Sequence, residues 1–192
     1  MDAAADFDAA VLGLALPHAV EAALREAGRH RAEPARAMAA LMRAQRLAPN
    51  HPAVLIAFYR HHFYGHRLNA ARDIARRALV VGAAALALPA VWREAPRRAL
   101  PGASDDPRTR FYLFTLKGYA YLSLRLHDAR EARDALALLR ALDPEDCVGA
   151  ALLEGVRRRA LAAAARHADA DDEPMPYVPA TGAAAWARLP AA

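Results

Sequence analysis

A set of large and small residues recurs along this chain with the same spacing between its members. The distance from one set to the next is the main constraint on the fold. The first set is Leu24, Ala37, Leu41, Ala44 and Pro49, with intervals of 13, 4, 3 and 5 residues. The same intervals separate Tyr119, Ala132, Leu136, Leu139 and Pro144, and the first three separate Phe58, Ala71, Ala75 and Ala78. The set at Phe58 begins 34 residues after Leu24, and 34 residues are the length of one helix–turn–helix unit. Such units are stable only when they stack on one another, so the interval predicts an all-α repeat fold.

Composition supports helices and excludes some partners. Alanine, the best helix former, supplies 53 of the 192 residues, and only 9 are glycine. The net charge is +5 and almost all positive charge is arginine, with Lys117 the only lysine. An arginine-rich face for nucleic acid is one interpretation of this charge. Because the arginines alternate with acids, we instead expect no nucleic-acid partner.

The single cysteine and the N-terminus indicate a cytoplasmic protein. Cys147 has no partner for a disulfide within the chain, which is typical of a reducing compartment. It follows Pro144-Glu145-Asp146, whose acidic side chains disfavour a thiolate, so we predict a small buried residue rather than a nucleophile. The N-terminus is acidic and lacks the basic region of a secretory signal. The most apolar stretch, 80–91, is too short to span a bilayer, so no membrane contact is expected.

Helix signals divide the chain into three segments. We expect an N-terminal segment over 1–16, a helical domain over 17–167 and a disordered, proline-rich and acidic tail over 168–192 that contains Trp186. The predicted helices cover residues 17–27, 34–47, 53–64, 68–86, 107–125, 129–141 and 145–166. Between the second and third hairpins lie 27 extra residues, which predict an irregular insertion over about 82–106.

Particular residues set these boundaries and the buried faces. Asp106-Pro107 and Asp143-Pro144 each resemble a helix start, and Asp128 to Glu131 has the form of a capping box. Within the insertion, Trp92 is expected to pack against the convex side of the stack. Helical spacing predicts one buried stripe in the second helix, formed by Ala37, Met38, Leu41 and Met42.

The segment 111–146 resembles a tetratricopeptide repeat. Its matching runs are Gly118-Tyr119-Ala120-Tyr121, His127-Asp128-Ala129-Arg130-Glu131-Ala132 and Leu142-Asp143-Pro144. The family's tryptophan in the first helix is absent from all three units, and Ala83 stands where a proline is expected. The resemblance implies a right-handed superhelical stack of three hairpins with a C-terminal capping helix. It also implies a non-enzymatic adaptor or chaperone that binds a protein segment in a concave groove.

Two narrower resemblances suggest a cellular role. Three repeats and a capping helix in a chain of this size resemble the small chaperones of bacterial type III secretion. The strings 51–56 (HPAVLI) and 111–118 (FYLFTLKG) are similar to small helical-repeat proteins found among bacterial nitrogen-fixation genes. Both resemblances place the chain in an accessory role.

The first helix of each hairpin lines the groove in tetratricopeptide-repeat proteins, and this implies a partner-binding site. The residues so placed are Arg60, Phe63, Tyr64, Lys117, Tyr121 and Arg125. Aromatic rings supply contact area and arginine supplies a planar fork for carboxylates, so the expected partner is an acidic peptide or protein segment. Alternatively, the aromatic residues pack between helices and the arginines are only solvated.

A histidine cluster offers a second function. His62 and His66 are one helical turn apart and His61 is adjacent, which is compatible with a metal-binding or catalytic site. No acidic residue or clear third ligand accompanies them, and Gly65 is expected to end the helix between them. We therefore expect no metal, no cofactor and no enzymatic activity. Self-association through the alanine-rich edges is a third alternative.

Overall fold

Every regular element in the described part of the chain is a helix, which confirms the all-α prediction. The computed structural model describes residues 16–103 and 105–171, without the side chains of 160 and 163–171. The helices are α2 (His18–Arg29), α3 (Pro34–Leu47), α4 (Pro52–Tyr64), α5 (Leu68–Ala85), the short 3₁₀ helix η2 (Trp92–Glu94), α6 (Pro107–Arg125), α7 (Ala129–Leu142) and α8 (Ala151–Asp171). No strand occurs among these described residues, and no helix there combines the length and hydropathy needed to cross a bilayer. The predicted N-terminal segment lies almost wholly outside the described residues, as does Trp186.

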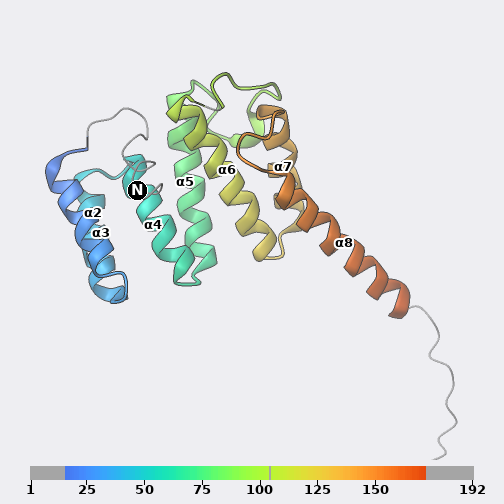
Figure 1. Ribbon diagram of the computed structural model, residues 1–192, viewed down its shortest axis with the longest axis horizontal. Coiled ribbons are helices and arrows are strands. Elements are labelled where there is room, and N and C mark those ends of the chain that lie inside the picture. Colours follow the sequence, from blue (N-terminus) through green and yellow to red (C-terminus); the bar gives the residue numbers. More distant parts are fainter. Residues whose placement is uncertain (1–15, 104, 172–192) are drawn as a thin grey trace, which may run out of the picture. The chain divides into compact units, whose positions relative to one another are not determined.

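Consecutive helices pack side by side as hairpins. Contacts are extensive between α2 and α3, between α4 and α5, and between α6 and α7, and α5 also packs along α6 (Figure 1). The junction between α3 and α4 is looser. Each predicted helical hairpin is therefore present, whereas the right-handed superhelical form of the stack stays a prediction.

The repeated positions are the ones that the hairpins bury. Almost every member of the three sets is inaccessible to solvent; Leu24 is partly buried, and Pro49 and Pro144 are exposed. Most of the buried members belong to one of two apolar clusters. The clusters meet at α5, whose Ile74 and Ala78 contribute to one cluster and Ala75 and Leu79 to the other. Because the alanine side chain is a single methyl group, the alanines at these positions let neighbouring helices approach closely.

The second and third hairpins turn in the same way. His66 after α4 and His127 after α6 adopt left-handed backbone conformations, with φ values of 57° and 59°. The next amide donates back to the helix in both cases, from Arg67 to the His62 carbonyl and from Asp128 to the Ser123 carbonyl, at 2.9 Å each. This is the hydrogen bond of a Schellman-type helix end. The turns within the second and third hairpins therefore have the same backbone geometry.

The insertion packs on the helices. α5 continues to Ala85, and the buried Trp92 of η2 stands edge-on to the Tyr119 ring, with 5.8 Å between the ring centroids. The Arg93 guanidinium lies over the Trp92 ring, 4.4 Å from its centroid. Further along, the Leu100 amide donates to the Leu142 carbonyl at 2.8 Å, which ties the segment to the end of α7.

The predicted start of the last helix at Asp143-Pro144 is wrong. The Asp143 carboxylate instead accepts from the Cys147 and Val148 amides at 3.0 Å each, which holds a turn. Gly149 has a φ of 69°, a conformation outside the right-handed helix. Asp146 then accepts from the Ala150 and Ala151 amides, and α8 begins at Ala151.

Other local expectations also differ from the structure. The predicted burial of Met42 is wrong, since this side chain is 49% exposed. α3 instead buries Ala40 and Ala44 beside Leu41. Cys147 is exposed in the turn before α8 and is not the predicted core residue.

The contacts of the chain divide it into two units, residues 1–157 and 158–192. Leu153 of α8 joins the core of the first unit, and α8 extends to Asp171, past the expected helix end near Arg166.

Candidate functional site

Aromatic rings from α4 and α6 meet in one cluster. The Phe63 ring stacks on Tyr59 with 5.9 Å between centroids, and it contacts Tyr121 of α6 at the same distance. Tyr64 meets Phe63 edge-on at 5.4 Å and is 70% exposed. We call Tyr59, Phe63, Tyr64 and Tyr121 the aromatic cluster. The Tyr64 ring is accessible to a partner, while the contact between Phe63 and Tyr121 joins the second hairpin to the third.

Tyr59 closes the inner side of the cluster against a glycine. A Cβ atom at Gly118 would lie 2.9 Å from the Tyr59 hydroxyl oxygen, so only a glycine lets this phenol approach α6 so closely. Burial, with smaller contributions from Tyr121 and Tyr64, raises the pKa of Tyr59 to about 12. The phenol is therefore neutral over the physiological pH range.

Cations and aromatic rings alternate along one face of α6. Arg110, Phe114, Lys117, Tyr121 and Arg125 follow one another at spacings of 4, 3, 4 and 4 residues, which place them on a single helix face. We call this row the α6 ladder. Phe114 has the Arg110 guanidinium 5.7 Å and the Lys117 ammonium 6.0 Å from its ring centroid. Arg125 lies over the Tyr121 ring and donates to the Tyr121 hydroxyl at 3.0 Å.

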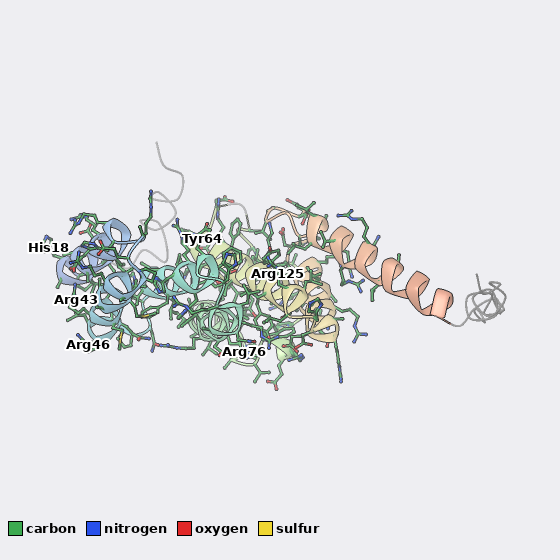
Figure 2. The ribbon with its side chains drawn as sticks, turned by 90° about the horizontal axis from the view of Figure 1, so that it is seen from below. His18, Arg43, Arg46, Tyr64, Arg76 and Arg125 are labelled. Carbon is green, nitrogen blue, oxygen red and sulfur yellow. The ribbon has the colours of Figure 1, made fainter. Side chains whose placement is uncertain are left out.

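The structure brings together four of the six predicted site residues: Phe63, Tyr64, Tyr121 and Arg125. Arg60 is exposed one helical turn before Tyr64. Lys117 lies on the same face of α6 as Tyr121, and its ammonium also donates to the Val148 carbonyl, which holds the turn before α8. In Figure 2, Tyr64 and Arg76 of α5 lie on opposite sides of the helices. The binding role of these residues stays a prediction.

Three members of the site were missed in the sequence. Tyr59 precedes Phe63 by four residues, and Arg110 and Phe114 continue the spacing of Tyr121 and Arg125 toward the start of α6. Counting back from Tyr121 in steps of three and four would have found the ladder. Tyr59 gives no such signal, because its position depends on the absence of a side chain at Gly118.

In the described part of the chain, the histidines at the end of α4 have no third metal ligand beside them. No group of three His, Cys, Asp or Glu side chains suited to a metal ion occurs among residues 16–103 and 105–162. His66 follows the helix in the left-handed turn, whereas His61 and His62 lie edge to face with 5.6 Å between their rings. Burial and the Arg67 charge lower the pKa of both His61 and His62.

Apart from the aromatic cluster, a polar network joins the insertion to the hairpins. The Glu131 carboxylate accepts from the Tyr119 hydroxyl and from Arg93, and Arg76 approaches the same phenol at 3.4 Å.

The predicted capping box at the start of α7 is only half formed. Asp128 accepts from the Glu131 amide at 3.3 Å, but the Asp128 amide donates to Ser123 rather than to Glu131.

The comparisons with known proteins show no family for this chain. No family model matches it, so membership of the tetratricopeptide-repeat family is not shown, and no solved structure matches it either. The chain is 42% identical over 115 residues to "Uncharacterized 19.8 kDa protein in nifW 5'region" of Azotobacter chroococcum mcd 1. The match covers 59% of this chain and 64% of that protein, and therefore less than two thirds of the relative. The similarity expected to proteins of nitrogen-fixation gene regions is confirmed to that extent.

Proposed function

We propose that this chain is a non-enzymatic protein-interaction module that binds an acidic protein segment in a groove between α4 and α6. In this proposal the three hairpins form a tetratricopeptide-like, right-handed stack whose first helices line the groove. The burial of the repeated positions and the matching turns after α4 and α6 support the stack. The contact of Phe63 with Tyr121 supports the pairing of α4 with α6.

The α6 ladder beside the aromatic cluster is the observation that carries the proposal. Exposed aromatic rings bury much area at low entropic cost, and arginine recognises carboxylates in a planar, two-pronged manner. Tyr64, Phe114 and Arg125 are exposed on this part of the fold, so a segment with carboxylates and apolar side chains is the complementary ligand.

We propose further that the module serves nitrogen fixation as an adaptor or chaperone. The support is the relative whose name places it in the nifW 5′ region. An adaptor or chaperone acts through a binding surface, and this proposal assigns that surface to the cations and rings of α6.

Site-specific photocrosslinking tests the binding face. A photoreactive amino acid replaces Tyr64, or Val80 of α5 as a matched exposed control, in the native host grown on dinitrogen. We expect the Tyr64 position to crosslink one protein through an acidic segment, identified by mass spectrometry, and the Val80 position not to do so. Equal crosslinking from both positions would contradict the proposed face.

Charge reversal then tests the chemistry with the purified partner. Arg60→Glu combined with Arg125→Glu should weaken binding at least about 100-fold, because carboxylates would face carboxylates. Arg140→Glu, an exposed reversal on α7, is the control and should bind as the wild type does. Unchanged affinity of the double variant would overturn the proposal.

A further inference from the structure

We propose that the acidic segment docks along the α6 ladder as an α-helix, with carboxylates seven and eight residues apart and apolar side chains between them. This inference rests on the proposed function and names the conformation and pattern of its ligand. It follows from the spacing of the ladder, which repeats cation, ring, cation, ring, cation along one helix face.

The ladder has the repeat of a helix laid beside a helix. Arg110 and Lys117 are seven residues apart and Arg125 follows eight later, so the cations are spaced by about 10 and 12 Å along the axis. A second helix with carboxylates at the same intervals presents them at the same rise. Its apolar residues, four positions after each of the first two carboxylates, would then lie over Phe114 and Tyr121.

An extended peptide does not keep this register. Residues on one face of an extended chain recur about every 6.7 Å, so four such steps cover about 27 Å. The four steps of the ladder from Arg110 to Arg125 cover only about 22.5 Å. The mismatch of about 4 Å moves the last side chain of an extended ligand about two thirds of a step beyond Arg125. A helical ligand therefore matches all five groups, which is the mode in which an amphipathic helix lies in a groove.

Lys117 and Arg125 each have more N–H donors than their contacts within the chain use. Arg125 gives the Tyr121 hydroxyl one of its five N–H groups, and Lys117 gives the Val148 carbonyl one of its three. The contact with Val148 also fixes the Lys117 ammonium, so less side-chain entropy is lost when a carboxylate binds.

Three synthetic peptides test the inference with the full chain. The matched 16-residue peptide has glutamates at its first, eighth and sixteenth positions and leucines at its fifth and twelfth, in an alanine and glutamine background. The shifted peptide keeps this composition but moves each glutamate to the opposite helix face. The broken peptide has two central prolines. Dissociation constants come from fluorescence anisotropy, and helicity from circular dichroism.

We expect the matched peptide to bind at least about 10-fold tighter than the other two and to gain helicity on binding. Arg125→Glu should abolish this preference, and Arg140→Glu should keep it. If the broken peptide binds as tightly as the matched one and still needs Arg125, the helical ligand is wrong while the acidic binding face stands. If none of the peptides binds, this inference is overturned, and the crosslinked partner then decides whether the face binds protein.

Discussion

His61 and His62, at the end of α4, have ring nitrogens that are buried and have no hydrogen-bond partner among the residues that the structure describes. The atoms are Nε2 of His61 and Nδ1 of His62. Burial disfavours the charged imidazolium, and the nearby Arg67 disfavours it further, so the pKa of each ring lies below its ordinary value. Both rings are therefore neutral in the folded protein at pH 7.

This depression predicts a loss of stability in mild acid. Below about pH 6.5 the unfolded chain binds protons at these two histidines that the folded chain does not yet bind. The two neutral rings therefore make their whole contribution to the free energy of unfolding above that pH. This contribution decreases as the pH drops toward the lowered pKa values. Urea unfolding between pH 7.5 and pH 5 should show the decrease, and it should be clearly shallower in the variant His61→Gln with His62→Gln.

The exposed His18 supplies the control for this pH dependence. His18→Gln should leave the slope of stability against pH close to that of the wild type. An equal slope in the double variant and the wild type would show that the buried pair does not cause the acid sensitivity.

At the scale of elements, the helix ends decide where the chain turns. Asp106 caps α6 by accepting from the Arg108 and Thr109 amides, as its sequence predicts. The ends of α4 and α6 are formed by His66 and His127 in the left-handed region, where a Cβ atom is unfavourable. Glycine is the common residue at such positions, so these two turns hold avoidable strain.

His127→Gly should therefore stabilise the protein by about 0.5–1 kcal/mol, because glycine adopts a positive φ without a steric cost. The histidine side chain is exposed, so little contact is lost. Chemical denaturation measures the gain. His127→Ala is the matched control, since it removes the imidazole but keeps the Cβ atom, and it should give no gain. Destabilisation by glycine would mean that the imidazole itself holds the turn.

At the scale of the whole first unit, the insertion after α5 is fastened to both helices of the third hairpin. Trp92 is only 8% exposed and reaches Tyr119 of α6, while Arg93 reaches Glu131 of α7. The backbone bond from Leu100 to Leu142 adds a second attachment. The insertion therefore acts as a strap across α6 and α7 rather than as a free loop.

Removing the tryptophan tests this role. Trp92→Ala should destabilise the protein by about 3 kcal/mol, the cost of deleting a large buried ring, and should raise the rate of tryptic cleavage at the exposed Arg97 and Arg98. Thermal unfolding and limited proteolysis measure the two effects. Trp92→Phe keeps a ring against Tyr119 and should be intermediate. Unchanged cleavage in Trp92→Ala would show that other contacts hold the strap.

Much of the fold could be predicted because its signals are local. Helix positions and the Gly65 and Asp106 boundaries each depend on a few neighbouring residues. The start of α8 could not be predicted, because the turn before it is held by side chains that bond to its backbone. Lys117 donates to the Val148 carbonyl and Asp143 accepts from the Val148 amide, and a residue pattern does not reveal such backbone contacts. Likewise, four predicted site residues meet at one face, but Tyr59 was missed because a glycine on another helix admits it.

The sequence by itself determined that this chain forms helices, where most of them begin and end, and which faces they bury, because backbone preference and helical periodicity act over a few residues. Only the tertiary structure decided which exposed groups come together. Phe63 and Tyr121 are far apart in the chain and meet because α4 and α6 both flank α5. A contact of this kind depends on how close two helices can approach, and that distance is set by the small residues packed between them.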